Sequence, residues 1–164
     1  MEILFENYES QLINAVIVAF AAVLTGLIGL EREYSGKPAG FRTHMLVGGA
    51  AALLVLVAEV IVQRSVEVQG AQSYIQADPI RVLEAIIVGV SFIGAGTVLK
   101  VEEGSRVKYL TTAASILFAA GVGIAVALYQ FILAILLVVT VLVINVVLAK
   151  IGARIGMKAK GGKE

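Results

Sequence analysis

Long apolar runs separated by short polar connections dominate this sequence. The hydrocarbon core of a bilayer is about 30 Å thick and takes about 20 helical residues, whereas a strand usually has only about 3–10 residues. Because runs of helical length recur along the whole chain, the pattern predicts an all-α integral membrane protein with five transmembrane helices. The predicted helices cover residues 12–30, 45–62, 82–99, 110–128 and 131–149.

The composition agrees with a chain whose solvent is mainly lipid. Of the 164 residues, 59% are hydrophobic and 15% are charged, and the mean hydropathy is +0.95. A soluble domain of this size would need more polar residues to cover its surface. We therefore expect one membrane domain over residues 1–150 and a short basic tail at 151–164 that anionic lipid attracts. The chain has no cysteine, which excludes disulfides, thiolate metal sites and cysteine nucleophiles.

The basic residues predict the direction of the helices, because loops rich in Lys and Arg stay on the cytosolic side. With the N-terminus outside and the C-terminus in the cytosol, 11 of the 13 Lys and Arg residues face the cytosol. Residues 1–10 include three glutamates and no basic residue, so the first apolar run does not resemble a signal peptide and is expected to remain as a helix. The sequence predicts a multi-pass protein of the cell (inner) membrane.

A weak internal repeat relates the first two predicted helices to the next two. Helices 12–30 and 82–99 both become rich in glycine toward the predicted cytosolic side, and the helix after each begins with threonine and small residues. This pattern indicates two parallel helical hairpins plus a fifth helix, as in transporters built from repeats. Small residues four apart more often let helices pack closely than form a cavity. Such pairs are Ala22/Gly26, Ala85/Gly89 and Ala119/Gly123.

Charged residues are predicted at the outer ends of the second and third helices. They are Glu59, Asp78, Arg81 and Glu84. Mg²⁺ typically takes one or two carboxylates and keeps several waters, so Glu59, Asp78 and Glu84 form a candidate outer Mg²⁺ site. Arg81 lies three residues before Glu84 and can act as its ion-pair partner. Interfacial ion pairing without a metal, with Asp78 as a helix N-cap, is the alternative.

Polar residues also gather at the predicted cytosolic ends of the first two helices. The stretch 29–33 ends the first helix, and the stretch 40–44 opens the second, where we expect Thr43 to act as the cap. His44 is the only histidine. A hydrogen-bonded residue at a helix end is its commoner role, although an ordinary pKa of about 6.5 also suits a pH sensor. No hydrolase spacing or phosphate-binding loop is present, so the sequence does not predict an enzyme.

Several of these stretches together resemble the membrane domain of the MgtC/SapB family. The matching segments are 29–32 (GLER), 37–47 (KPAGFRTHMLV), 78–81 (DPIR), 92–96 (FIGAG) and 110–115 (LTTAAS). They follow in order along the first four predicted helices, whereas the fifth helix matches only in hydropathy. The third helix departs from the family at Ala85 and Ser91. The soluble carboxyl-terminal domain that many relatives carry has no counterpart in these residues.

The resemblance implies which functions to expect of this chain and which residues carry them. Family members are implicated in growth at low magnesium and in acid survival, and some are thought to act on other membrane proteins, including ATP synthase. Asp78 and Arg81 stand in a matching motif on the outer side. The candidate cytosolic site consists of Glu31, Arg32, Arg42, Thr43, His44, Gly94, Gly96, Thr111 and Thr112.

Three functions remain open at this point. The first is a modulator that supports magnesium or acid-stress homeostasis by contacting a partner membrane protein, such as ATP synthase, through small-residue helix faces. The second is a Mg²⁺ transporter or channel, against which the scarcity of polar residues in the middle of the predicted helices weighs. The third is a structural scaffold. Small-residue pairs on exposed helix faces also favour a homodimer, and no nucleic-acid partner is expected.

Overall fold

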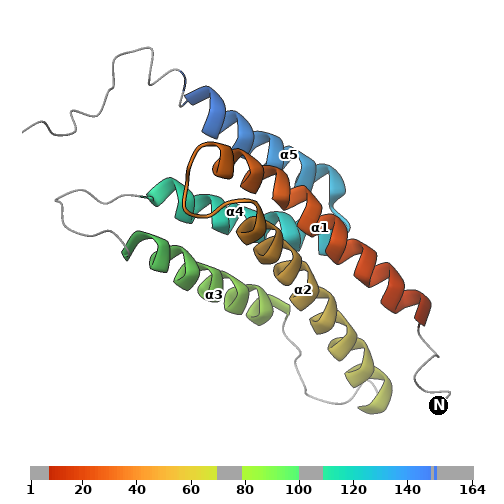
Figure 1. The fold of residues 1–164 in the computed structure, drawn as a ribbon. Helices are drawn as coiled ribbons and strands as arrows, with labels where there is room; N and C mark the ends of the chain where they lie inside the picture. Colours follow the sequence, from red (N-terminus) through yellow and green to blue (C-terminus); the bar gives the residue numbers. More distant parts are fainter. Residues whose placement is uncertain (1–7, 70–78, 100–108, 149, 151–164) are drawn as a thin grey trace, which may run out of the picture.

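The computed structural model describes residues 8–69, 79–99, 109–148 and 150, and in these ranges all regular secondary structure is helical (Figure 1). The all-α prediction is therefore confirmed. The helices are α1 (Tyr8–Tyr34), α2 (Phe41–Gln69), α3 (Pro79–Leu99), α4 (Leu110–Ala127) and α5 (Phe131–Val143), and a π-helical turn, η2 (Ile144–Leu148), continues α5.

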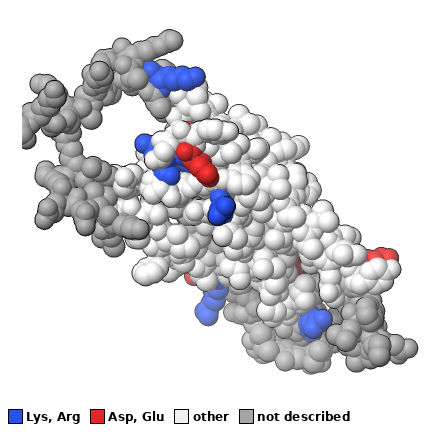
Figure 2. Space-filling model, viewed as in Figure 1, with Lys and Arg blue, Asp and Glu red and all other residues white. Residues whose placement is uncertain are grey.

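Four of these helices, α1 to α4, are long and apolar enough to cross a membrane. The fifth is apolar but shorter, and η2 extends it. Large apolar side chains cover the outside of the bundle, with Phe92 82% and Ile132 78% exposed, as expected for residues that face lipid. Figure 2 shows charged residues toward the two ends of the bundle and a broad band without them in between. The chain is a multi-pass membrane protein.

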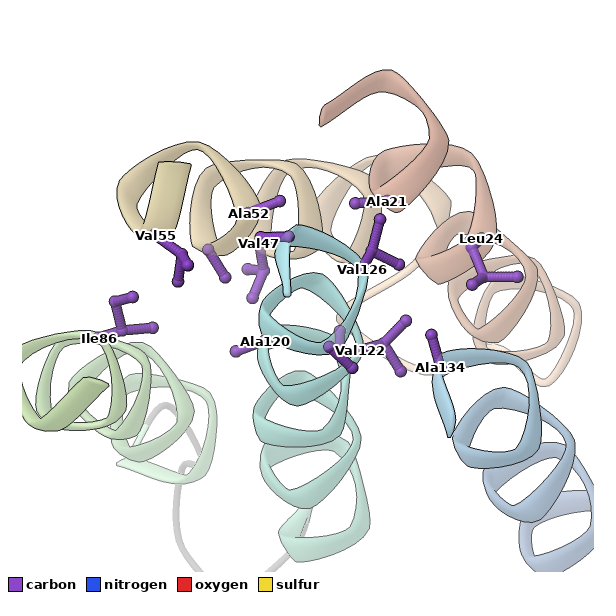
Figure 3. Packing of buried hydrophobic residues seen from close by; sticks show 14 of the residues in the cluster. Ala21, Leu24, Val47, Ala52, Val55, Ile86, Ala120, Val122, Val126 and Ala134 are labelled. Carbon is purple, nitrogen blue, oxygen red and sulfur yellow. The ribbon is translucent and has the colours of Figure 1, made fainter. Parts of the chain in front are cut away.

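Helix α4 occupies the centre of the bundle, where it contacts α1, α2, α3 and α5. More than half of its residues are buried, including Ile116, Ala120, Val122 and Val126. Figure 3 shows side chains from α1, α2, α3 and α5 gathered around it. Helix α3 packs against α2 and α4 through one side, where Ile86, Val90 and Gly94 are buried and Val82 and Leu83 are partly buried.

Small residues bring α2 and α4 into direct backbone contact and let the backbone of α2 pack on a side chain of α1. A Cβ placed on Gly123 of α4 would overlap the backbone of Gly48 in α2, and a Cβ on Gly48 would overlap the side chain of Thr25 in α1. Thr25 is fully buried, and its hydroxyl donates to the carbonyl of Ala21, 2.9 Å away, in its own helix. The centre of this three-helix contact is therefore tightly packed and apolar.

The three small-residue pairs differ in what they contact. Gly26 packs against Phe41 and Met45 of α2, and Gly123 packs against Gly48, so the pairs that contain them lie inside the bundle. Gly89 of α3 is exposed, and a Cβ added there would meet no atom within 4 Å. This third pair, Ala85/Gly89, stays open toward the outside.

The start of α2 differs from the prediction. Helix α2 already begins at Phe41, so Thr43 lies within its first turn and the prediction that Thr43 caps it was wrong. The cap comes from the preceding helix instead, because the Phe41 N–H donates to Oε2 of Glu33 at 2.8 Å.

A three-residue turn containing Tyr129, whose φ is 58°, joins α4 to α5 as neighbours in contact. The orientation in the membrane and the two-hairpin repeat stay predictions.

Candidate functional site

Polar side chains converge at the end of the bundle where α1 ends and α2 and α4 begin. We call this the Arg32 end, after its buried arginine; the sequence predicts it to be cytosolic. It contains two hydrogen-bonded groups and one pocket. The first group is formed by Glu31, Arg32 and Ser35, and the second by Gly40, His44, Thr112 and Ser115.

Glu31 and Arg32 form a bidentate ion pair at the end of α1. Nε of Arg32 donates to Oε2 of Glu31 at 2.6 Å, and Nη2 donates to Oε1 at 2.8 Å. The Ser35 hydroxyl also donates to Oε1, at 2.8 Å. The side chain of Arg32 is only 4% exposed and that of Glu31 is 13% exposed. Two parallel bonds fix the guanidinium plane, and Nη1 is not committed to Glu31.

The turn between α1 and α2 is held by backbone contacts close to this ion pair. Its tightest point is Gly36, whose φ of 64° suits glycine. The Lys37 N–H donates to the carbonyl of Arg32 at 3.0 Å. A Cβ on Gly29 would lie 2.7 Å from the carbonyl oxygen of Gly40 and 2.9 Å from Cβ of His44. Glycine at position 29 is therefore what lets the start of α2 lie directly on α1.

His44 is fully buried between α2 and α4. Its Nδ1 lies 2.9 Å from the carbonyl oxygen of Gly40, and its Nε2 lies 3.1 Å from Oγ of Ser115. A carbonyl oxygen only accepts, so Nδ1 carries a proton. The expectation of a hydrogen-bonded histidine near a helix end agrees with this placement, although the second partner comes from a distant helix.

The Ser115 hydroxyl has one proton and two neighbouring acceptors. It lies 2.8 Å from the carbonyl oxygen of Thr112 as well as 3.1 Å from Nε2 of His44. With neutral His44, the hydroxyl can donate to only one of them; with protonated His44, Nε2 donates to Oγ and the hydroxyl is free to donate to Thr112. The proton of His44 and the orientation of Ser115 are thereby coupled.

A pocket of about 400 Å³ opens beside the ion pair. Its walls come from the end of α1 with the turn that follows it, the start of α4, and η2, so three regions distant in sequence meet there. The lining residues are Arg32, Lys37, Tyr109, Thr111, Thr112, Ile144 and Asn145. Among these described residues, two are cationic, three carry a hydroxyl, one is an amide, and none is a carboxylate. Most of the wall surface is apolar, and each of its polar side chains can donate a hydrogen bond.

Asn145 enters the pocket from η2, the π-helical turn after α5. Its side chain is 7% exposed. Nδ2 lies near the Glu31 carboxylate, but within the described residues it has no partner at hydrogen-bonding geometry. A buried amide without a partner is costly, and π-helical turns inside helices are frequently found at functional sites.

The remaining residues of the predicted cytosolic site lie apart from this pocket. Arg42 is exposed and Thr43 is half-buried. A Cβ placed on Gly94 of α3 would lie 3.4 Å from Cβ of Ala113, which indicates a packing role for this glycine. Gly96 is exposed, with no atom within 4 Å of an added Cβ. Of the nine predicted residues, the structure places Arg32, Thr111 and Thr112 in the pocket wall, with Glu31 and His44 behind it.

The predicted outer Mg²⁺ site is only partly described. Glu59, Arg81 and Glu84 are exposed, and Asp78 lies outside the described residues. Glu59 accepts a long hydrogen bond, 3.4 Å, from Nε2 of Gln63. Within the described ranges, no three His, Cys, Asp or Glu side chains lie close enough to hold a metal ion. The outer Mg²⁺ site stays a prediction.

Sequence reasoning missed three contributors to the Arg32 end. Asn145 had a signal, because it is one of only two polar residues in the apolar segment 131–148, and polar residues within membrane helices are often functional. Lys37 was part of a matching segment but was not assigned a role. Ser115 could not be assigned from sequence, since its partner His44 is 71 residues away.

Comparison with known proteins identifies the family of this chain. The profile of the MgtC family matches residues 18–154, a range that includes α2, α3, α4, α5 and most of α1. The chain belongs to the MgtC family. All pocket-lining residues lie inside the matched range. No solved structure matches the chain significantly.

Individual MgtC-family relatives are bacterial. The chain is 36% identical over 106 residues to "Putative magnesium transporter YhiD" of Escherichia coli K12, covering 65% of this chain and 46% of that protein. It is 32% identical over 152 residues to "Protein MgtC" of Salmonella typhimurium, covering 90% of this chain and 59% of that protein. The chain therefore spans about half the length of the curated relatives it matches.

Proposed function

We propose that this MgtC-family protein supports magnesium or acid-stress homeostasis in the bacterial inner membrane by acting on a partner membrane protein. The link to magnesium rests on the name of the YhiD relative and on the family. The packing at the centre of the bundle is the observation that favours a modulator over a transporter. There α2 and α4 touch backbone to backbone at Gly48 and Gly123.

This packing leaves little room for a hydrated ion between α1, α2 and α4. Mg²⁺ gives up its waters reluctantly, and pores for ions are lined with polar groups along their length. The contact instead consists of glycines, alanines and branched apolar side chains. Thr25 is the buried polar side chain nearest Gly48, and its hydroxyl is bonded within α1. Helices packed in this way suit a protein that binds a partner better than one that conducts an ion.

The exposed face of α3 is the contact we propose for the partner. Ala85, Gly89, Phe92 and Gly96 are all exposed and follow the spacing of one helical face. Cβ atoms added at Gly89 and Gly96 would meet nothing within 4 Å. Small residues let a second transmembrane helix approach closely, and van der Waals packing then holds the pair together. Phe92, at 82% exposed, would add the largest apolar contact.

In-cell crosslinking tests this contact. A photoreactive residue at position 92 is expected to capture a membrane protein during growth at low magnesium. Gly89→Leu, which fills the open face, should abolish both the crosslink and the support that the protein gives to growth at low magnesium. Ser91→Leu is the matched control, because Ser91 is exposed on another side of the same helix, and it should leave both unchanged. Capture of only a second copy of this chain would contradict the partner model and favour a homodimer.

A magnesium transporter is the second candidate, supported by the name of the YhiD relative. Purified protein in liposomes that contain a Mg²⁺-sensitive dye separates the two functions. We expect no Mg²⁺ entry above that of empty liposomes, with an ionophore as the positive control. Entry that depends on this protein, and that falls in Glu59→Gln or Glu84→Gln, would overturn the modulator and establish transport through the outer acidic residues.

A further inference from the structure

We propose that the pocket at the Arg32 end binds an oxyanion, with a phosphate group as its ligand. The proposal concerns a small-molecule site and does not depend on the partner contact at α3. It rests on three features that independently supply donors to the same space: the start of α4, the cationic side chains of α1 and its turn, and Asn145 of η2.

The start of α4 offers backbone donors. The residue before it, Tyr109, has φ 67°, and no side chain caps the helix. Ala113 is the residue whose N–H bonds back to the carbonyl of Tyr109, so the N–H groups of the preceding helical residues have no acceptor within the helix. Thr111 and Thr112, which line the pocket, belong to this first turn. A helix N-terminus of this kind favours an anion.

The cationic side chains determine the sign of the charge at the pocket wall. Lys37 and Arg32 both line it, and no carboxylate from the described part of the chain does. Glu31 balances Arg32 from behind and holds its guanidinium in a fixed plane through two bonds, while Nη1 stays available to a ligand. Lys37 is exposed and has no carboxylate partner within the described residues. The described residues therefore give the pocket wall a net positive charge.

Asn145 is the observation that separates this pocket from an ordinary helix end. A side chain that is 93% buried rarely leaves an amide unpaired. Nδ2 of Asn145 lies near the Glu31 carboxylate but makes no hydrogen bond of acceptable geometry to it or to another described residue, and Asn145 lines the pocket. A small rotation of the amide toward the pocket would give it an acceptor in a bound oxyanion. Phosphate oxygens only accept hydrogen bonds when ionised, which matches a lining of N–H and O–H donors.

Two sources could supply the same phosphate chemistry. Inorganic phosphate would be free in the aqueous compartment, and a phospholipid headgroup would reach the pocket from the membrane surface. At about 400 Å³, the pocket has room for either a hydrated phosphate or a phosphate that carries a glycerol. The lining donors would contact the phosphate in both cases, so the source is decided by experiment.

The test uses the full chain, purified in a maltoside detergent, with two probes measured by titration calorimetry. The probes are inorganic phosphate and short-chain phosphatidylglycerol, and a short-chain neutral glycolipid is the negative reference. The variants are Lys37→Ala and Asn145→Leu. Arg42→Ala is the matched control, because Arg42 follows the same turn and is exposed but does not line the pocket. Lys37→Ala removes an exposed side chain and should fold normally.

Saturable binding is expected for at least one probe. Lys37→Ala should weaken it roughly tenfold, the usual effect of losing one charge-assisted hydrogen bond, and Asn145→Leu should weaken it similarly, while Arg42→Ala leaves it unchanged. This pattern with inorganic phosphate identifies a soluble ligand; with phosphatidylglycerol alone, it identifies a lipid headgroup. Absence of binding for both probes, or equal weakening by Arg42→Ala and Lys37→Ala, would overturn the proposal.

Discussion

At the residue scale, the Glu31–Arg32 ion pair joins two neighbours in sequence whose side chains leave the helix in different directions. The pair forms because the long arginine side chain turns back onto Glu31, and Ser35 supplies a third bond to the same carboxylate. Both residues could be assigned to a site from the sequence motif. Their mutual contact could not be, because residues next to each other on a helix do not normally face each other.

Glu31→Gln should destabilise the protein by about 3 kcal/mol, because it leaves the buried guanidinium of Arg32 without its counter-charge. Arg32→Met in the same chain should restore part of that loss, since the uncompensated charge is then gone. Thermal unfolding of the purified protein in detergent measures both effects. Independent, additive losses in the single and double variants would show that the two side chains do not interact.

Ser115→Ala removes the hydroxyl that lies between His44 and the Thr112 carbonyl. We expect a loss of about 1–3 kcal/mol, because Nε2 of fully buried His44 then has no partner. Thr140→Val is a suitable control: its hydroxyl bonds only to the Leu136 carbonyl on an exposed part of α5. Equal melting temperatures for Ser115→Ala and the unaltered protein would contradict this role.

At the element scale, hydropathy located the helices, but it could not locate their ends or their buried sides. An apolar run marks the part of a helix that lies in lipid, and this depends on local composition alone. The ends of a helix depend on contacts with other segments. Helix α1 continues past residue 30 to Tyr34, and α2 begins at Phe41 because Glu33 from α1 caps it. Likewise, the sequence showed three small-residue pairs without indicating that Ala85/Gly89 would face outward.

Gly29→Ala should separate the ends of α1 and α2. The new methyl group would lie within 3 Å of the Gly40 carbonyl oxygen and of the Phe41 Cα, and backbone cannot move aside as a flexible side chain can. We expect overpacking of about 1–3 kcal/mol or more, measured by thermal unfolding. Gly96→Ala is the matched control, with no atom near its added Cβ; similar losses for both would show that crowding is not the cause.

At the scale of the whole molecule, orientation is the prediction that the packing of the helices leaves open. The absence of cysteine makes it directly testable with single-cysteine variants. Gln130→Cys, in the turn between α4 and α5, should react with an impermeant maleimide in intact spheroplasts, since the distribution of basic residues predicts that this turn lies outside. Lys37→Cys should react only after the membrane is permeabilised. The reverse pattern would place the Arg32 end outside.

The backbone contact between Gly48 and Gly123 also has a consequence for how the bundle comes apart. Helices that touch at the backbone cannot slide or tilt without first separating. Helix α1 approaches the backbone at the start of α2 in the same way at Gly29, so α1, α2 and α4 form one unit that opens cooperatively. Helix α3 is attached through the side chains of one of its faces. Increasing amounts of a harsh detergent should therefore release α3 at a lower concentration than the one that separates α1, α2 and α4, so that disassembly proceeds in two stages.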